Sequence, residues 1–222
     1  MKILIAIPCM DHIPVGFVQS ISNLLVESAK KRTGNEISVY FKPNSLVYDS
    51  RNLISLYAIE NKFDAILWLD SDMMFKPDTL DVMLNDMRDL RAEMITGVYV
   101  KRYFPTAPVL YKEIGEPIRK PDGTLERDIQ TYDNYPKDTV FTVAGCGFGC
   151  VLTTVSLLKE LWDKFGPPFA PFVWASEDIS FCYRVGKLNK LIYCDSNIHL
   201  GHIGTFVYTE TLLNRGEENG KG

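Results

Sequence analysis

The sequence lacks several features that identify common protein classes. No apolar run among its 222 residues approaches the roughly 20 residues that a membrane-spanning helix needs, so we expect a soluble protein or one with only peripheral membrane contact. Neither the P-loop nor the dinucleotide-binding glycine pattern follows a strand-like segment, which disfavours both folds. Basic residues are not in excess either, because 24 Lys and Arg stand against 28 Asp and Glu and give a net charge of −4. This balance offers no broad electrostatic reason to bind nucleic acid.

The five cysteines include no C-x-x-C pair and are odd in number. Neither a disulfide framework nor a zinc ribbon is therefore indicated, and reduced cysteines favour a cytoplasmic location. Cys146 and Cys150 lie close together across a glycine-rich segment. Zinc ligation is one interpretation of this pair, and two buried small side chains are the more common one.

Strand-like and helix-like segments alternate in the first hundred residues. Continuous apolar runs such as KILIAIP and DAILWLD predict strands that are covered on both faces, with helical spacing between them. The alternation predicts a mixed, mainly parallel sheet flanked by helices, which binds ligands beyond the carboxyl ends of its strands. The expected strands are 2–8, 36–41, 64–70 and 93–100; the expected helices are 14–31, one from Asp49 or Ser50 to about Lys62, and one opened by Pro77.

The second half of the chain is less regular. Residues 113–137 are polar and rich in turn residues, which predicts a hairpin or a mobile lobe. A strand, a glycine-rich turn, a strand and a helix follow, and Ser176 is placed to cap the next helix. A short strand at 190–195 is expected to lead into a loop that carries His199 and His202.

No linker or internal repeat divides the chain. We expect a single domain over residues 1–213. The last segment, 214–222, is small and polar, which predicts a flexible tail.

An Asp-Ser-Asp triplet ends one of the buried strands, in the segment LWLDSDMMF. Side chains alternate along an extended chain, so Asp70 and Asp72 point the same way and repel each other unless a cation lies between them. Carboxylate oxygens suit Mg²⁺ or Mn²⁺, which also bind diphosphate oxygens. A solvated turn is the plainer interpretation of such a triplet, but its position after a wholly apolar strand favours a metal site. Pro8–His12 and Val100–Arg102 also follow strands and are expected at the same crevice.

An ordered series of segments resembles glycosyltransferases with the GT-A fold, especially the large inverting family 2 group. The resemblance spans about residues 2–205 and rests on the triplet LWLDSDMMF together with ILIAIP, DSRN (49–52), GCGFGCVL (145–152), ASEDISFCYRV (175–185) and NIHLGHIG. It implies a GT-A-like, Rossmann-like α/β fold, with a nucleotide-binding half at 1–102 and an acceptor-binding half at 103–213. It also implies metal-dependent, inverting transfer of a hexose from a nucleotide-sugar to a glycan or related hydroxyl acceptor, with UDP-sugar favoured over GDP-sugar as the donor.

The resemblance further implies a metal and donor site. Asp72 is the expected main ligand for Mn²⁺ or Mg²⁺, Asp70 assists, and His202 matches the family's late histidine. His199, three residues earlier, is the competing ligand. The metal would stabilise charge on the leaving diphosphate. The expected donor-binding residues are Pro8, Asp11, Arg51, Asp70, Ser71 and Lys101.

Plainer interpretations of these basic residues stay open. Arg51 stands at a predicted helix start, where it is also placed to pair with Asp49 alone. Lys101 and Arg102 follow a strand and are equally typical of a solvated basic turn.

Transfer also needs a base that takes the proton of the acceptor hydroxyl. By the resemblance, Asp178 is the expected base, and Glu177 is its catalytic neighbour that binds acceptor or sugar hydroxyls. Both acids also stand in the first turn of a predicted helix, where they simply favour the positive end of its dipole. Gly147 and Trp174 are expected to bind the acceptor, and a tight turn and a buried tryptophan are their structural alternatives.

Two other functions are alternatives to glycosyl transfer. Sugar-nucleotidyltransferases resemble one another in a glycine-rich, arginine-bearing loop directly after the first strand. Here that position reads CMDHIP and has no glycine, which argues against them. A non-catalytic nucleotide-sugar-binding module is the alternative from another class.

Overall fold

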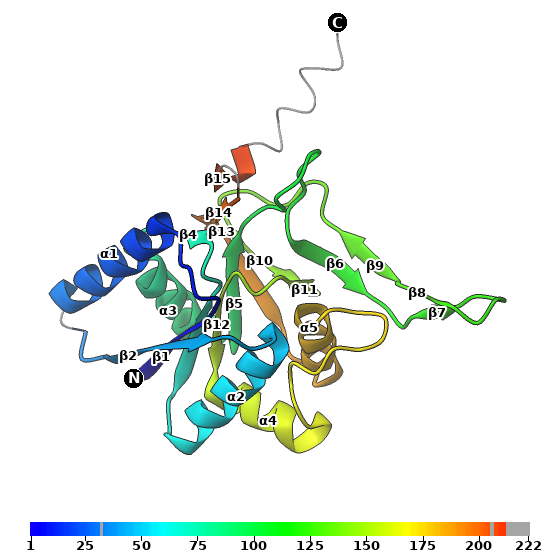
Figure 1. The fold of residues 1–222 in the computed structure, drawn as a ribbon, viewed down its shortest axis with the longest axis horizontal. Coiled ribbons are helices and arrows are strands. Elements are labelled where there is room, and N and C mark those ends of the chain that lie inside the picture. The colour runs from blue at the N-terminus through cyan, green and yellow to red at the C-terminus, as the bar shows by residue number, and fades with distance from the viewer. Residues whose placement is uncertain (32, 205–206, 212–222) are drawn as a thin grey trace, which may run out of the picture.

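The computed structural model describes residues 1–31, 33–204 and 207–211. Over these residues the centre of the molecule is a seven-stranded sheet in the order β10-β13-β5-β12-β3-β1-β2 (Figure 1). Five of its strands run in one direction and two run against them, so the predicted mixed, mainly parallel sheet is confirmed. The parallel strands are β1 (Lys2–Cys9), β2 (Glu36–Pro43), β3 (Ala65–Leu69), β5 (Met94–Val98) and β13 (Ile192–His199); the reversed strands are β10 (Val140–Val143) and β12 (Cys150–Thr154).

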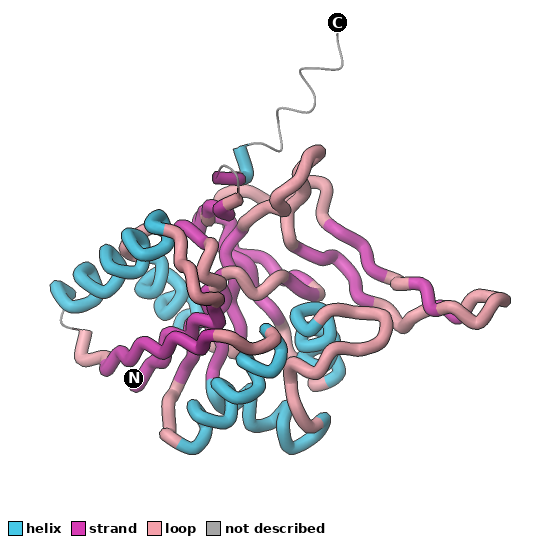
Figure 2. Tube along the Cα trace, in the orientation of Figure 1, coloured by secondary structure: helices cyan, strands magenta, loops and turns pink. Residues whose placement is uncertain are grey.

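Helices cover both faces of this sheet, as Figure 2 shows. Alternate side chains of β1 separate the two layers: Ile3, Ile5 and Ile7 belong to one apolar core, and Leu4 and Ala6 belong to the other. The first core includes side chains from α1 (Val15–Lys31) and α3 (Thr79–Asp89). The second includes side chains from α2 (Val47–Glu60), α4 (Val155–Phe165) and α5 (Glu177–Lys187). Because both faces are buried, the parallel strands read as unbroken apolar runs.

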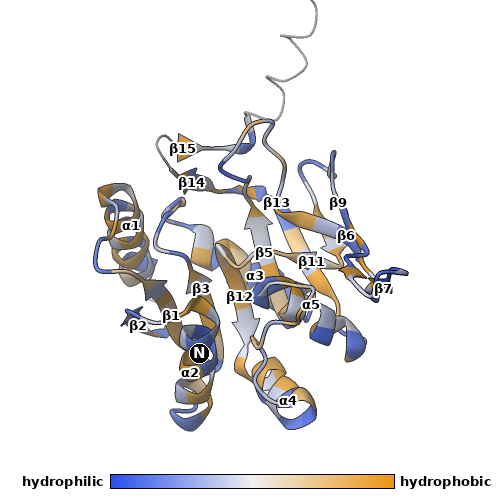
Figure 3. Ribbon diagram, turned by 45° about the vertical axis from the view of Figure 1, so that its right-hand side comes forward, coloured by the Kyte–Doolittle hydropathy of each residue, from blue (hydrophilic) through white to orange (hydrophobic). Residues whose placement is uncertain are grey.

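A smaller sheet of three strands and a two-stranded hairpin form a lobe that projects from the body (Figures 1 and 2). Its outer end is hydrophilic in Figure 3, which fits its position in solvent. The hairpin predicted for residues 113–137 is confirmed, whereas mobility of this segment stays a prediction. The lobe consists of β6 (Leu110–Ile114), β9 (Ile129–Thr131), β11 (Gly145–Cys146), β7 (Ile118–Arg119) and β8 (Leu125–Glu126).

The late histidines lie on strands and not in the loop that the sequence predicted. The strand expected at 190–195 continues to His199, because β13 keeps pairing with β5 as far as Val98. His202 lies in β14 (Gly201–Ile203), which pairs with β4 (Met73–Met74) on one side and β15 (Val207–Tyr208) on the other. This pairing brings His202 beside the Asp-Ser-Asp segment that precedes β4.

Two helix starts were predicted from capping residues and one from a proline in the first turn, and two of these three starts were wrong. Helix α2 begins at Val47, two residues before the earlier predicted cap, and no side chain caps it. Pro77 lies in a turn closed by the Thr79 amide, so α3 begins two residues later than expected. Ser176 does occupy the N-cap of α5, but its hydroxyl donates to the Asp178 carboxylate and does not cap the helix backbone.

Within the described ranges, every helix is too short or too polar to cross a bilayer. The predicted tail at 214–222 lies outside the described residues.

Candidate active site

A cavity of about 380 Å³ opens at the carboxyl ends of β1 and β3, beside the connection from β2 to α2. This volume lies within the range of small-ligand sites, and the edge of the sheet is where ligands of such folds bind. Four residues predicted for the donor site line the cavity, namely Pro8, Asp70, Ser71 and Asp72. The full lining is Pro8, Cys9, Met10, Ser45, Leu46, Val47, Asp70, Ser71 and Asp72.

The turn that carries the two aspartates is fastened to strands on both sides. The Asp70 amide donates to the Gly149 carbonyl at 3.0 Å, which ties the turn to β12. The Ile203 amide donates to the Asp72 carbonyl at 2.7 Å, which ties it to β14. The turn therefore presents its carboxylates from a rigid backbone, as a ligand site requires.

Asp72 has one carboxylate oxygen engaged and one buried oxygen without a hydrogen-bond partner among the described residues. Its Oδ2 accepts a hydrogen bond from Arg102 Nη1 at 2.7 Å and lies 3.6 Å from His202 Nε2. Its Oδ1 is buried, and no donor from the described residues reaches it. Burial acts to raise the pKa of Asp72, but His202 and Arg102 together hold it below its usual value. The carboxylate is thus ionised at neutral pH, as a metal ligand must be.

The ring of His202 is fixed by a backbone carbonyl. Its Nδ1 lies 2.9 Å from the Val100 oxygen, which can only accept a hydrogen bond, so Nδ1 carries the proton. In the neutral ring Nε2 then points a lone pair toward Asp72. Two acceptors that face each other in this way need a proton or a cation between them. A ligating histidine that donates its other N–H to a carbonyl is a common arrangement in metal sites.

The three predicted metal ligands do not converge as a set of three. Among the residues that the structure describes, no group of three or more His, Cys, Asp or Glu side chains is arranged to hold a metal ion. Asp70 turns toward Arg51, and His199, the competing ligand, pairs with Glu210 at 2.9 Å. Asp72 and His202 remain as a pair. They fit a hard divalent ion that takes its other ligands from substrate phosphate and water.

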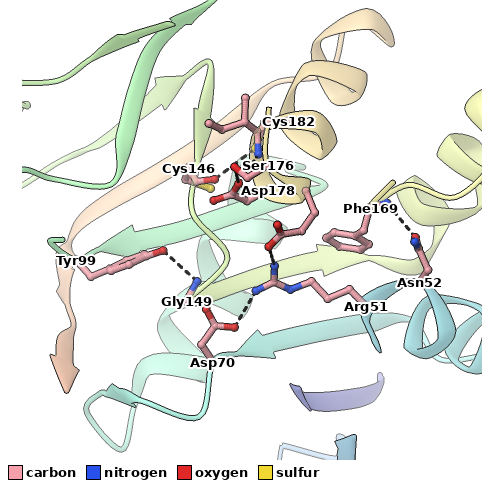
Figure 4. A network of polar contacts seen from close by, with 12 residues as sticks. Arg51, Asn52, Asp70, Tyr99, Cys146, Gly149, Phe169, Ser176, Asp178 and Cys182 are labelled. Atoms are coloured by element: carbon pink, nitrogen blue, oxygen red, sulfur yellow. Dashed lines mark hydrogen bonds and ion pairs between the residues drawn. The ribbon is translucent and has the colours of Figure 1, made fainter. Parts of the chain in front are cut away.

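A buried guanidinium joins the donor side of the site to the start of α5. Arg51 Nη2 donates to Asp70 Oδ1 at 2.8 Å, and Nη1 donates to Glu177 Oε1 at 2.5 Å (Figure 4). The rings of Phe148 and Phe169 lie 5.2 and 5.8 Å from the guanidinium carbon. Arg51 therefore pairs across the molecule, and not with the neighbouring Asp49 that was its plainer predicted partner.

The pKa values in this group follow from burial and charge. Burial raises the pKa of Asp70, and the Arg51 guanidinium opposes that rise. Burial acts to lower the pKa of Arg51, but Asp70 and Glu177 together raise it, so the guanidinium stays charged. The three side chains carry a net charge of −1 when both carboxylates are ionised.

Asp178 stands in the first turn of α5 and is partly exposed. Its Oδ1 accepts from the Ile179 amide at 2.8 Å and from the Ser176 hydroxyl. These bonds fix the carboxylate at the positive end of the helix dipole. The other oxygen, Oδ2, is left for an external hydroxyl, which suits the predicted role as a base.

Tyr99 is a site residue that the sequence analysis missed. Its hydroxyl accepts from the Gly149 amide at 3.3 Å, and its ring meets the His202 ring edge-on at 5.3 Å. Burial raises the pKa of Tyr99 well above its ordinary value, and the charges of Asp70 and Asp178 raise it further. A protonated phenol thus lies near both carboxylates. No sequence signal marked Tyr99, because it lies in an apolar strand-like segment where a tyrosine looks like a core residue.

Gly147, predicted for acceptor binding, and the nearby Gly149 make room for this tyrosine. A Cβ at Gly147 would lie 2.0 Å from the Tyr99 oxygen and 2.7 Å from Val109 Cγ1, and one at Gly149 would lie 3.0 Å from Tyr99 Cζ. The close approach seen at Gly147 is therefore to a protein side chain. Contact of Gly147 with an acceptor stays a prediction.

Trp174 lies in an aromatic cluster near the start of α5. Its ring stacks on Phe172 at 5.0 Å and meets Tyr183 edge-on at 5.5 Å. The tryptophan is partly exposed, so the structure leaves part of its surface open toward solvent.

Three other predicted residues lie outside the cavity lining. Asp11 is exposed, Arg51 is buried behind Asp70, and Lys101 extends over the Tyr103 ring with Nζ 5.7 Å from its centroid. Cys146 and Cys150 are free and buried, which agrees with the two-small-residue interpretation.

No protein-family model matches the chain, and no curated protein sequence matches it. Solved structures with the same fold include the crystal structure of A197 from STIV, with a TM-score of 0.60 at 16% identity over 92% of this chain and 86% of that one. Another is the crystal structure of GalNAc-T7 with UDP, GalNAc and Mn²⁺, with a TM-score of 0.56 at 9% identity over 92% of this chain and 44% of that one. The chain has a GT-A-like fold.

At these identities the likeness establishes the fold and not the reaction. The chain also spans less than half of the GalNAc-T7 chain. The GT-A-like fold that the sequence predicted is confirmed, and membership of the inverting family 2 group stays a prediction.

Replacing Gly147 by alanine should lower the free energy of unfolding by about 1–3 kcal/mol, because the new methyl group meets the Tyr99 hydroxyl. Tyr99→Phe in the same chain removes that contact and should recover part of the loss. Chemical denaturation measures both. Gly186→Ala is the matched control, since nothing lies within 4 Å of its Cβ, and it should leave stability unchanged or raised. No recovery from Tyr99→Phe would show that Tyr99 does not set the requirement for glycine.

Proposed function

We propose that this protein is a metal-dependent glycosyltransferase that moves a sugar from a nucleoside diphosphate sugar to a hydroxyl acceptor. The observation that carries the proposal is the Asp72–His202 pair, with a buried carboxylate oxygen that no donor from the described residues reaches, beside a cavity in a GT-A-like fold. The GalNAc-T7 structure, which holds UDP, GalNAc and Mn²⁺, lends support through the shared fold.

The donor lies in the cavity between β1 and the β2–α2 connection. Its nucleoside packs against Pro8 and Leu46, and its diphosphate faces Asp72 and His202. When bound through these two side chains, Mn²⁺ supplies positive charge to the leaving diphosphate. Arg102, which holds Asp72 Oδ2, adds a second positive charge at the same place. We favour UDP-sugar over GDP-sugar as the donor.

Asp178 acts as the general base. The acceptor oxygen forms a bond to the anomeric carbon while the bond from that carbon to the diphosphate oxygen breaks, and Asp178 Oδ2 takes the hydroxyl proton. A single displacement of this kind inverts the anomeric centre. Trp174 is partly exposed and offers an apolar face to a sugar acceptor.

Nucleotide with Mn²⁺ should stabilise the protein against thermal unfolding. At 100 times Kd the gain is about 2.7 kcal/mol, and it should require both components. Asp72→Asn should abolish most of the gain because it removes a metal ligand. Asp89→Asn, at an exposed site on α3, is the matched control and should keep the full effect. A wild-type protein that gains nothing from UDP or GDP with Mn²⁺ would refute the donor site.

Asp178→Asn should lower the rate of transfer about 10²–10⁴-fold while nucleotide binding stays unchanged, because only the base is lost. UDP release from a panel of UDP-sugars, with water or added sugars as acceptors, measures the rate. Asp133→Asn in the lobe is a matched control of the same chemistry. Near-normal turnover in folded Asp178→Asn protein would remove Asp178 from this role.

A further inference from the structure

Glu177 and Asp70 come from opposite sides of the site and meet on one guanidinium. Asp70 follows β3, and Glu177 opens α5, 107 residues later in the chain. Arg51 uses two different nitrogens, Nη2 for Asp70 and Nη1 for Glu177. The planar fork of an arginine can hold two carboxylates at a fixed separation in this way, and a lysine ammonium cannot.

The guanidinium is built into the core and is not directed at the cavity. The Arg51 side chain is 3% exposed, and the aromatic ring of Phe169 packs against it (Figure 4), as does that of Phe148. Phe169 is itself held in place, because its amide donates to Asn52 Oδ1 at 2.9 Å. A charge in so dry a place is tolerated only with its partners present, which makes the geometry of the three side chains rigid.

Glu177 has little freedom to bind an acceptor. Its side chain is 17% exposed, and its Oε1 is taken by Arg51 at 2.5 Å. Asp178, the next residue, differs in its partners, since among the described residues its hydrogen bonds come from Ser176 and the Ile179 amide and use Oδ1 alone. The backbone that carries Asp178 is therefore held through Glu177 and Arg51 to Asp70.

We propose that Arg51 and Glu177 are positioning residues that set the distance between the base Asp178 and the donor cleft, and that neither of them touches the substrates. The inference rests on the proposed function, because it takes Asp178 as the base. It assigns to Glu177 a different task from the acceptor contact that the sequence predicted.

Hydrolysis of the donor distinguishes a positioning role of Glu177 from an acceptor-binding role, because water then replaces the acceptor. UDP-glucose and UDP-N-acetylgalactosamine with Mn²⁺ are the probes, and UDP release is the readout. Glu177→Ala should lower kcat for hydrolysis about 100-fold, the scale of a 1 Å misplacement, with donor KM within twofold of wild type. Glu177→Gln keeps an oxygen for Arg51, so its kcat should lie between those of Glu177→Ala and wild type. An unchanged rate of hydrolysis in Glu177→Ala would overturn the proposal and restore an acceptor role.

Arg51→Lys tests the other end of the link. It keeps the charge but not the fork, so it should lower kcat, and combining it with Glu177→Ala should add little further loss because both changes break the same link. If the loss of kcat in the double variant equals the product of the two single losses, the two residues do not share one link. Glu126→Gln, in the exposed hairpin, is the control and should match wild type.

Hydrogen exchange tests the link without any substrate. In Glu177→Ala the amides of the first turn of α5 should exchange faster, and so should the Asp70 and Met73 amides in the turn after β3. Faster exchange confined to α5 would overturn the proposal. Because this readout needs no turnover, an absence of UDP release in the wild type would count against the proposed function alone.

Discussion

A buried guanidinium requires negative charge beside it, and this requirement organises the site. Arg51 lies in the core with Asp70 on one nitrogen and Glu177 on another. Removing Arg51 would leave both carboxylates without their counter-charge, and losing one partner of such a buried group typically costs about 3–5 kcal/mol. The end of β3 and the start of α5 are therefore fixed relative to each other. This also fixes the position of Asp178 relative to the cleft.

The second feature of the site is positive charge at the cleft. Asp72 accepts a hydrogen bond from Arg102 and lies 3.6 Å from His202 Nε2. In the proposed function, Asp72 and His202 hold the metal beside this arginine. A nucleoside diphosphate would meet both, which fits the leaving group of the proposed reaction.

The sequence predicted those parts of the structure that depend on local pattern. Unbroken apolar runs predicted the central strands, and the triplet Asp70–Asp72 was placed at the cavity that now contains it. The start of α2 was predicted wrongly because the helix begins at Val47 and no side chain caps it. Arg51 was assigned to the donor site by the family resemblance. Its pairing with Glu177 was missed because the two are 126 residues apart, and no local pattern records such a contact. Tyr99 was missed for a similar reason, since its neighbours in space are glycines from a distant turn.

Whether Asp72 and His202 hold the metal of a bound nucleotide is the central claim. Pulsed electron paramagnetic resonance of the protein with Mn²⁺ and UDP tests it most directly, because it detects nuclei bound to the ion. We predict coupling to ³¹P from the diphosphate and to one histidine ¹⁴N in the same complex, with the nitrogen coupling lost in His202→Gln. Phosphorus coupling without a nitrogen, or Mn²⁺ that stays with free UDP, would contradict the assignment.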